Sequence, residues 1–208
     1  MYKHIIWDFD GTLFDTYPVM GQIFKETLEE EGITEALDEI IKHMKISMGT
    51  ALRHYENAYR ISNSFIENYN KKRLSMEFSL CKPFDGIEDI CKYIHAIGGR
   101  NYLYTHRGES AITFLKDYNL YDYFSDFITS KQNFERKPSP DAILYLLTEH
   151  IINPNEAIMI GDRDLDILSA KNAGIHACFF TDGSNACENS DYTINNFQQL
   201  YSIIGPAV

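Results

Sequence analysis

Short apolar runs recur along the chain, and each is followed by a loop and then by a stretch with helical spacing. The apolar runs cover residues 4–9, 101–105, 126–129, 157–160 and 176–180, and the helix-like stretches lie at about 86–97, 108–118, 139–150 and 164–173. Short apolar runs bounded by loops are typical of buried strands, and strands that alternate with helices favour a parallel sheet covered on both faces. The pattern predicts a doubly wound α/β fold, in which ligands bind beyond the carboxyl ends of the strands.

Residues 16–81 interrupt this alternation. They carry almost no strand signal, while residues 22–28 and 64–69 have the apolar spacing of helices. An all-helical insertion after the first strand indicates a separate small domain, and proline and glycine residues punctuate the chain at both of its ends. We predict a catalytic α/β core made of residues 1–15 and 82–208, and a helical cap domain made of residues 16–81.

Composition and charge narrow the classes of function. The chain has 208 residues, of which 44% are hydrophobic and 24% charged, and its formal net charge is −11. This usage is that of an ordinary folded protein, and the length suffices for one domain that carries a smaller insertion. Nucleic acids and anionic membrane surfaces repel a strongly acidic chain. We therefore expect neither as a partner, and an anionic substrate would need a locally positive site.

The cysteines and the amino terminus favour a cytoplasmic protein. Cys81, Cys91, Cys178 and Cys187 form no C-x-x-C pair and match no zinc-binding spacing, so we expect free thiols in a reducing compartment. The first apolar run is too short for a signal peptide. No stretch approaches the roughly 20 apolar residues of a membrane span.

The most informative polar residues stand at the end of the first apolar run. Asp8 and Asp10 are separated by one residue, so on a strand their side chains point to the same side. Two carboxylates this close repel, and both stay ionised only beside a cation. Gly11 then allows a sharp turn and a close approach of the backbone to a ligand. An isolated pair of this kind is equally often just a strand that ends in a turn.

A second group of acids follows the apolar run at 157–160. Asp162 stands at the end of this run, and Asp164 and Asp166 enter the next helix-like stretch. Acids in a first helical turn commonly serve only to stabilise the helix, and we assign Asp164 to that role. Asp162 is expected at the same sheet edge as Asp8, where oxygen ligands would suit Mg²⁺.

Two further residues stand where a phosphate group could bind. Thr105 ends the run at 101–105 and leads through His106 and Arg107 into a helix, whose free N–H groups would receive phosphate oxygens. Lys137 precedes another helix. Taken alone, such a threonine is more often a helix cap, and such a lysine is more often an ordinary surface residue.

The order of these residues along the chain changes their interpretation. An Asp-x-Asp pair, a threonine, a lysine and a Gly-Asp-x-x-x-Asp run occur in that order, each at the close of a strand. In this respect the chain resembles the haloacid dehalogenase-like hydrolases, in the branch with a helical cap that includes phosphoglycolate phosphatases and β-phosphoglucomutases. The resemblance spans nearly the whole core, and residues 161–167 and 170–174 are especially typical. The cap matches only in position and helical character.

The resemblance implies catalytic and metal-binding roles for four acids. Asp8 is expected to be the nucleophile, and Asp10 the general acid and base. Asp8, the backbone carbonyl of Asp10 and the carboxylate of Asp162 are expected to contact Mg²⁺, with Asp166 supporting the metal site from nearby.

The resemblance also implies a phosphate-binding group. Thr105 is expected to hydrogen-bond the phosphoryl group, and Lys137 to steady both the nucleophile and the phosphate. Gly11, His106 and Arg107 complete the expected substrate contacts. His106 departs from the family pattern, because asparagine or serine often follows the threonine in relatives, and a structural role is as plausible for it as a substrate contact.

The resulting prediction is a Mg²⁺-dependent phosphatase that hydrolyses a small phosphate ester through a phospho-aspartate on Asp8. The core motifs leave the substrate open. In the cap, His43, Lys45, Arg53 and His54 are candidates for reading the leaving group, although for each of them a solvated helix face is the better interpretation. We expect a monomer or a weak homodimer.

Four alternatives remain at this point. A phosphomutase would return the phosphate to a sugar, but the cap shows no signature for it. A dehalogenase would not need the second acid, Asp10. A receiver-type phospho-acceptor domain shares the clustered acids, threonine and lysine, but it is shorter and carries no helical insertion. A catalytically weak regulator is unsupported, because every expected catalytic position is filled.

Overall fold

Parallel strands form the sheet of the larger of two units in this computed structural model, which describes residues 1–181, 183 and 187–205. Within the described residues the sheet has six strands in the order β3-β2-β1-β4-β5-β6. The strands are β1 His4–Trp7, β2 Arg100–Tyr104, β3 Phe124–Ile128, β4 Ala157–Gly161, β5 His176–Phe180 and β6 Tyr192–Ile194. β1 lies between β2 and β4, and Trp7 at its end is in register with Leu103 and Ile160. The carboxyl ends of these three strands therefore meet at one edge of the sheet.

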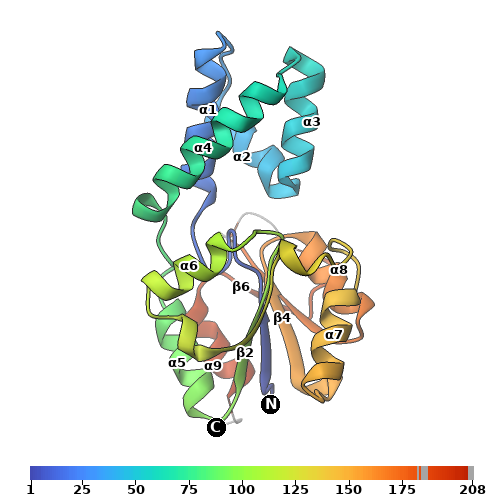
Figure 1. Ribbon diagram of the computed structural model, residues 1–208. Coiled ribbons are helices and arrows are strands. Elements are labelled where there is room, and N and C mark those ends of the chain that lie inside the picture. Colours follow the sequence, from blue (N-terminus) through green and yellow to red (C-terminus); the bar gives the residue numbers. More distant parts are fainter. Residues whose placement is uncertain (182, 184–186, 206–208) are drawn as a thin grey trace. The chain divides into compact units, whose positions relative to one another are not determined.

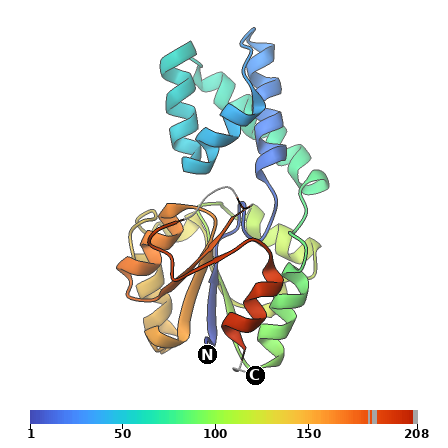
Figure 2. The same ribbon diagram turned by 180° about the vertical axis from the view of Figure 1, so that it is seen from behind.

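Helices cover both faces of this sheet, with α5 and α9 on one face and α7 and α8 on the other (Figure 1, Figure 2). The helices of this unit are α5 Ile87–Ala96, α6 Ser110–Asp117, α7 Asp141–Glu149, α8 Asp164–Asn172 and α9 Leu200–Ile204, with short 3-10 helices at Tyr121–Tyr123, Ser130–Gln132, Pro154–Glu156 and Phe197–Gln199. Because side chains alternate along a strand, Ile6, Tyr102 and Met159 share one face and pack in one buried cluster with Ile143 of α7 and Ile167 of α8. The doubly wound α/β fold predicted from the sequence is confirmed.

Trp7 anchors the opposite face of the sheet. Its side chain is fully buried, and its indole N–H donates to the side-chain oxygen of Asn101 at 2.9 Å. The indole ring lies 6.1 Å from the ring of Phe197, which in turn lies 4.4 Å from that of Phe180. Trp7 immediately precedes Asp8, so this packing fixes the strand end from which the first acid projects.

The smaller unit, Asp15–Lys82, consists of helices. They are α1 Tyr17–Glu30, α2 Leu37–Ile46, α3 Met48–Tyr59 and α4 Asn63–Leu80. Phe24 of α1 is at its centre, with ring centroids 5.2 Å from Tyr55, 5.0 Å from Phe65 and 5.1 Å from Tyr69. Such aromatic pairs add about 0.5–1.5 kcal/mol each to the burial of their surface, so the unit has an apolar core of its own.

The two segments that lead into and out of the helical insertion run beside each other. The backbone N–H of Asp15 donates to the carbonyl of Lys82 at 3.0 Å, and that of Phe84 donates to the carbonyl of Leu13 at 3.1 Å. An isolated antiparallel bridge lies between the same two segments. The insertion therefore begins and ends at one place in the chain fold.

The four cysteines are free thiols, as the sequence predicted, and the structure buries all four. Within the part of the chain that the structure describes, no helix combines the length and the apolar character that crossing a membrane requires.

Candidate active site

Three of the predicted site residues follow directly on neighbouring strands. Asp8 comes after β1, Thr105 after β2 and Asp162 after β4. The backbone N–H of Asp8 donates to the carbonyl of Ile160 at 2.9 Å, and that of Thr105 donates to the carbonyl of Ile128 at 2.9 Å. The sheet register thus extends to these residues and brings them to the same edge.

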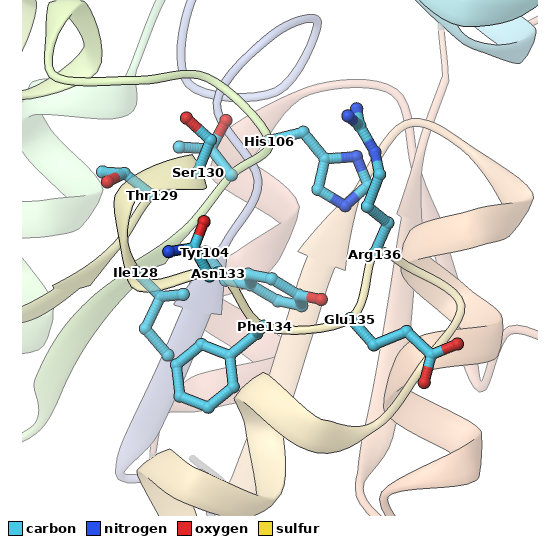
Figure 3. A pocket seen from close by; sticks show the side chains of 10 residues that line it. Tyr104, His106, Ile128, Thr129, Ser130, Asn133, Phe134, Glu135 and Arg136 are labelled. Atoms are coloured by element: carbon cyan, nitrogen blue, oxygen red, sulfur yellow. The ribbon is translucent and has the colours of Figure 1, made fainter.

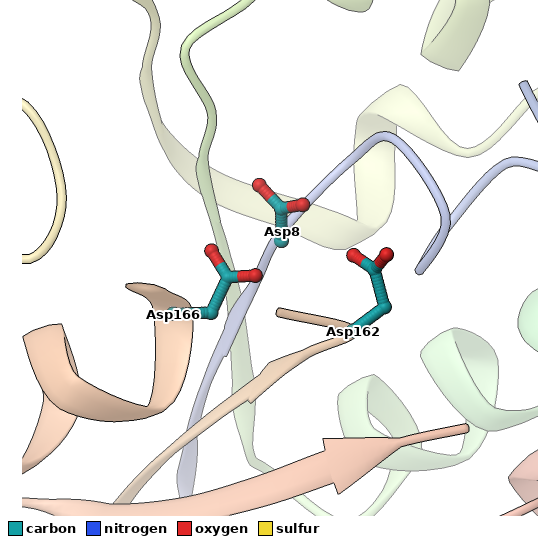
Figure 4. A group of neighbouring side chains, drawn as sticks. All are labelled: Asp8, Asp162 and Asp166. Carbon is teal, nitrogen blue, oxygen red and sulfur yellow. The ribbon is translucent and has the colours of Figure 1, made fainter. Parts of the chain in front are cut away.

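A cluster of carboxylates lies at this edge. Asp8, Asp162 and Asp166 each place one oxygen within 4.8 Å of the other two; Asp8 and Asp162 project from strand ends, and Asp166 projects from the start of a helix (Figure 4). Asp166 belongs to the first turn of α8 and is fully buried against Gly161. A Cβ at Gly161 would lie 2.3 Å from the Cβ of Asp166, so a side chain at this position would displace the acid.

Lys137 bridges two of these acids from the interior. Its ammonium group donates to Asp8 Oδ1 at 2.7 Å, to Asp166 Oδ1 at 2.7 Å and to the backbone carbonyl of Tyr104 at 2.8 Å. The side chain is fully buried. Burial by itself would lower the pKa of Lys137, but the charges of Asp166 and Asp8 raise it above its usual value. The lysine is therefore a fixed positive charge beside the expected nucleophile.

Arg163 is a second cation in the cluster, and the sequence analysis did not identify it. Its Nη2 lies 3.3 Å from Asp8 Oδ2, and its Nε lies 3.5 Å from Asp166 Oδ2. Its backbone N–H also donates to Asp166 Oδ2 at 3.2 Å. The sequence did contain a sign of this role, because Arg163 is the one basic residue between Asp162 and Asp164 in an otherwise acidic segment.

The three carboxylates differ in their electrostatic environment. Burial raises the pKa of Asp8, and the charge of Asp166 adds to this rise, while Lys137 and Arg163 oppose it. Burial by itself would also raise the pKa of Asp166, but Lys137 and Arg163 outweigh it and hold that pKa below its usual value. Burial raises the pKa of Asp162 well above its usual value, beyond what the charge of Arg163 offsets. Asp162 is therefore the acid whose charge is least compensated.

The two oxygens of Asp162 have different partners. Oδ1 accepts a hydrogen bond from the hydroxyl of Thr12 at 3.3 Å, a contact that the sequence analysis also missed. Oδ2 is buried and has no hydrogen-bond partner among the described residues. A buried carboxylate oxygen without a donor is costly, and a divalent cation held by oxygen ligands would satisfy it. The donor set thus fits a hard cation such as Mg²⁺.

Asp10 is paired with Arg107 beside this cluster. Arg107 Nη2 lies 2.6 Å and Nε 3.1 Å from Asp10 Oδ1. Gly11, with φ of +77°, follows Asp10 and turns the chain, and its N–H donates to the carbonyl of Phe14 at 2.9 Å. A residue with a side chain would be strained in this backbone conformation.

Thr105 and His106 border a pocket of about 240 Å³ between the ends of β2 and β3 (Figure 3). The Thr105 hydroxyl accepts the backbone N–H of Arg107 at 3.0 Å, and His106 Nε2 accepts the backbone N–H of Lys137 at 3.0 Å. Burial and the charge of Lys137 lower the pKa of His106 to about 3. The imidazole is therefore neutral at neutral pH and carries its proton on Nδ1.

The structure thus brings Asp8, Asp162, Asp166 and Lys137 into one cluster, with Asp10 and Arg107 paired next to it. Asp164 is exposed at the start of α8. The catalytic and metal-binding roles that the resemblance implies for the other residues stay predictions.

Known proteins resemble this chain over most of its length. The sequence profile of the family described as haloacid dehalogenase-like hydrolase matches residues 5–180. A phosphoglycolate phosphatase of Vibrio vulnificus is 27% identical over 97% of this chain and 96% of its own length. A pyrophosphatase of Halalkalibacterium halodurans is 25% identical over 97% of this chain and 96% of its own. Among solved structures, a hydrolase from Streptococcus pneumoniae superposes with a TM-score of 0.68 at 30% identity, covering 98% of both chains.

Proposed function

Because the chain belongs to the family of haloacid dehalogenase-like hydrolases, we propose that it is a phosphatase that hydrolyses a small phosphate monoester through a phospho-aspartate on Asp8. One observation carries the proposal: the ammonium group of Lys137 donates to Asp8 at 2.7 Å inside a cluster of three carboxylates. A buried acid held beside a fixed cation at the carboxyl edge of a parallel sheet can attack an anionic substrate. The phosphoglycolate phosphatase name of one relative favours a phosphate ester as substrate, and the pyrophosphatase name of another adds the phosphoanhydride pyrophosphate as a candidate.

We propose Mg²⁺ as the cofactor. Asp8, Asp162 and the backbone carbonyl of Asp10 would hold it, and Asp166 would support it from nearby. The orphaned Oδ2 of Asp162 supports this assignment. When bound, the ion supplies positive charge that offsets repulsion between the carboxylate nucleophile and the phosphate.

The proposed reaction has two steps. In the first, a carboxylate oxygen of Asp8 attacks phosphorus, the ester P–O bond breaks, and Asp10 gives its proton to the departing oxygen. In the second, Asp10 takes a proton from water, whose oxygen attacks the same phosphorus. The acyl phosphate bond then breaks, which releases inorganic phosphate and restores the carboxylate of Asp8.

The surrounding residues orient the phosphoryl group. Lys137 stabilises negative charge on its oxygens while it holds the nucleophile. The hydroxyl of Thr105 is buried at the same edge, 2% of the residue being exposed, and is proposed to hydrogen-bond a phosphoryl oxygen. Neutral His106 offers an N–H from Nδ1 but no charge.

A phosphatase screen tests the proposal. Wild-type protein is incubated with Mg²⁺ and a panel of phosphate esters that includes 2-phosphoglycolate, together with pyrophosphate, and released phosphate is measured. Asp8→Asn should abolish turnover, and acid-quenched wild-type enzyme should carry phosphate on the peptide that contains Asp8. Asp164→Asn is the matched control, because this exposed acid at the start of α8 lies outside the proposed site and its loss should leave turnover unchanged.

Two results would contradict the proposal. Substantial turnover by Asp8→Asn would remove the nucleophile assignment, and full activity in excess chelator would remove the metal.

A further inference from the structure

The pairing of Asp10 with Arg107 has a specific geometry. Arg107 Nη2 and Nε both donate to Asp10 Oδ1, at 2.6 and 3.1 Å, whereas Oδ2 is 3.3 Å from Nε. The Arg107 side chain is 3% exposed and that of Asp10 is 21% exposed. A buried guanidinium thus binds one oxygen more closely than the other, on a carboxylate that is partly exposed to solvent.

Arg107 is itself held from several sides. Its guanidinium carbon lies 5.2 Å from the ring centroid of Phe9 and 5.6 Å from that of Phe114 in α6. Nη1 is 3.4 Å from the hydroxyl of Ser110, and the backbone N–H donates to Thr105 Oγ1 at 3.0 Å. A planar guanidinium packed against two rings that also contact each other has restricted rotational freedom, so it imposes its own orientation on the carboxylate that it binds.

The two carboxylate oxygens are therefore not equivalent. Oδ1 takes the two shorter contacts with the guanidinium. The contact of the guanidinium with Oδ2 is longer, at 3.3 Å, and a carboxylate oxygen has two lone-pair sites, of which this contact occupies one. A proton carried by Asp10 is best accommodated on Oδ2, the oxygen that Arg107 holds less tightly.

We propose that Arg107 is a positioning residue for proton transfer: it anchors Asp10 through Oδ1 and presents Oδ2 to the reacting oxygens. This inference rests on the proposed phosphatase function. In the first step the proton moves from Asp10 Oδ2 to the leaving oxygen as the P–O bond breaks. In the second it moves from water to Oδ2 as the water oxygen bonds to phosphorus. Arg107 touches neither reacting atom and acts only through Asp10.

The chemistry of the leaving group separates this role from a general structural one. An alkyl alcohol is a poor leaving group without a proton, so its ester depends on the general acid. p-Nitrophenolate leaves readily as an anion, so its ester depends on that acid much less. A misplaced Asp10 should therefore slow the alkyl ester selectively.

The test compares kcat/KM for 2-phosphoglycolate, or the best alkyl phosphate of the screen, with kcat/KM for p-nitrophenyl phosphate. Arg107→Gln should lower the value for the alkyl ester by about 10²-fold or more, in line with the contribution of general acid catalysis. The value for the aryl ester should fall less than about tenfold, since it needs little proton transfer. Arg107→Lys keeps the charge but not the planar fork and should show the same selectivity with a smaller loss. Arg100→Gln, at the exposed amino end of β2, is the matched control and should change neither value.

A second arm places Arg107→Gln in an Asp10→Asn background. If Arg107 acts only through Asp10, the double variant should be no slower than Asp10→Asn alone. Hydrolysis of the aryl ester also shows whether a variant is folded. If Arg107→Gln does not fold, both experiments are done with Arg107→Lys instead.

Three outcomes overturn the inference. Parallel losses on the two esters in an active, folded variant would show a structural role. A further loss in the Asp10→Asn background would show that Arg107 contacts the phosphate directly. A wild-type protein that hydrolyses neither ester would refute the proposed function and this inference together, which distinguishes it from the first two results.

Discussion

Replacing Lys137 by methionine removes the nearer of the two cations that Asp8 and Asp166 share, since Arg163 lies 3.3 Å from Asp8 and 3.5 Å from Asp166. Both acids are buried, at 1% and 0% exposure of their side chains, and each accepts a 2.7 Å hydrogen bond from this lysine. Removing one partner of a buried ion pair leaves uncompensated charge and costs about 3–5 kcal/mol. Methionine has a similar length, so little of the effect should come from a cavity. We expect Lys137→Met to lower the free energy of unfolding of the metal-free α/β unit by about this amount.

Urea unfolding in the presence of chelator measures this loss. Trp7 is the single tryptophan of the chain and is fully buried in β1, directly before Asp8, so its fluorescence reports the α/β unit. Lys131→Met is the matched control, because that lysine pairs with Glu109 on the surface with 60% of its side chain exposed. Exposed pairs contribute about 0–1 kcal/mol, so this variant should unfold almost as the wild type does.

A second variant tests the electrostatic cause. Lys137→Met combined with Asp166→Asn removes one of the two charges that Lys137 had balanced and leaves Arg163 to balance the other, so it should be more stable than Lys137→Met alone. A loss below about 1 kcal/mol in the single variant, which is the range of a surface pair, would refute the reasoning. So would a double variant that is no more stable than the single one.

Three further predictions concern neighbouring residues. Gly161→Ala should push Asp166 out of place and destabilise the α/β unit by about 1–3 kcal/mol, as overpacking does, with weaker Mg²⁺ binding in calorimetry; wild-type affinity and stability would contradict it. Asp162→Asn removes the least compensated charge, so it should weaken Mg²⁺ binding yet raise the metal-free free energy of unfolding, and unchanged binding would exclude Asp162 as a ligand. The pKa of His106 is about 3 in the folded protein and about 6.5 in the unfolded protein. As pH falls below about 6.5, the unfolded state therefore gains a proton on this imidazole before the folded state does. The free energy of unfolding then decreases by at most about 1.4 kcal/mol per pH unit. His106→Gln should therefore lose less stability than the wild type between pH 7 and pH 5 in urea titrations, and identical losses would refute the assignment.

The sequence located the central strands because a parallel strand covered on both faces is apolar throughout. β4, with every residue buried, is the clearest case. β6 was missed because it has three residues at the edge of the sheet, of which only Ile194 is buried. α9, with five residues, was likewise too short to show a helical period.

At the site, the sequence could place the acids but not the contacts that the cations make with them. The ends of neighbouring parallel strands meet, so acids that follow apolar runs can be placed at one edge from sequence. Which cation approaches which acid depends on side-chain packing instead. Arg107 reaches Asp10 with its guanidinium packed against Phe9 and Phe114, and Phe114 comes from a helix distant in sequence from Phe9. Single-sequence patterns carry no such information. The domain limits, the cytoplasmic location, the oligomeric state and the expected lack of nucleic-acid and membrane partners stay predictions.

The neighbouring ends of the helical insertion have an evolutionary consequence. Since Asp15 and Lys82 are hydrogen-bonded to each other, the two chain connections between the α/β unit and the insertion lie side by side, and a short loop could replace the insertion there with little loss of entropy. Such an insertion can be lengthened, exchanged or lost as a module while the sheet and its acids stay unchanged. Selectivity for the leaving group can then diversify without any change to the residues that handle phosphorus.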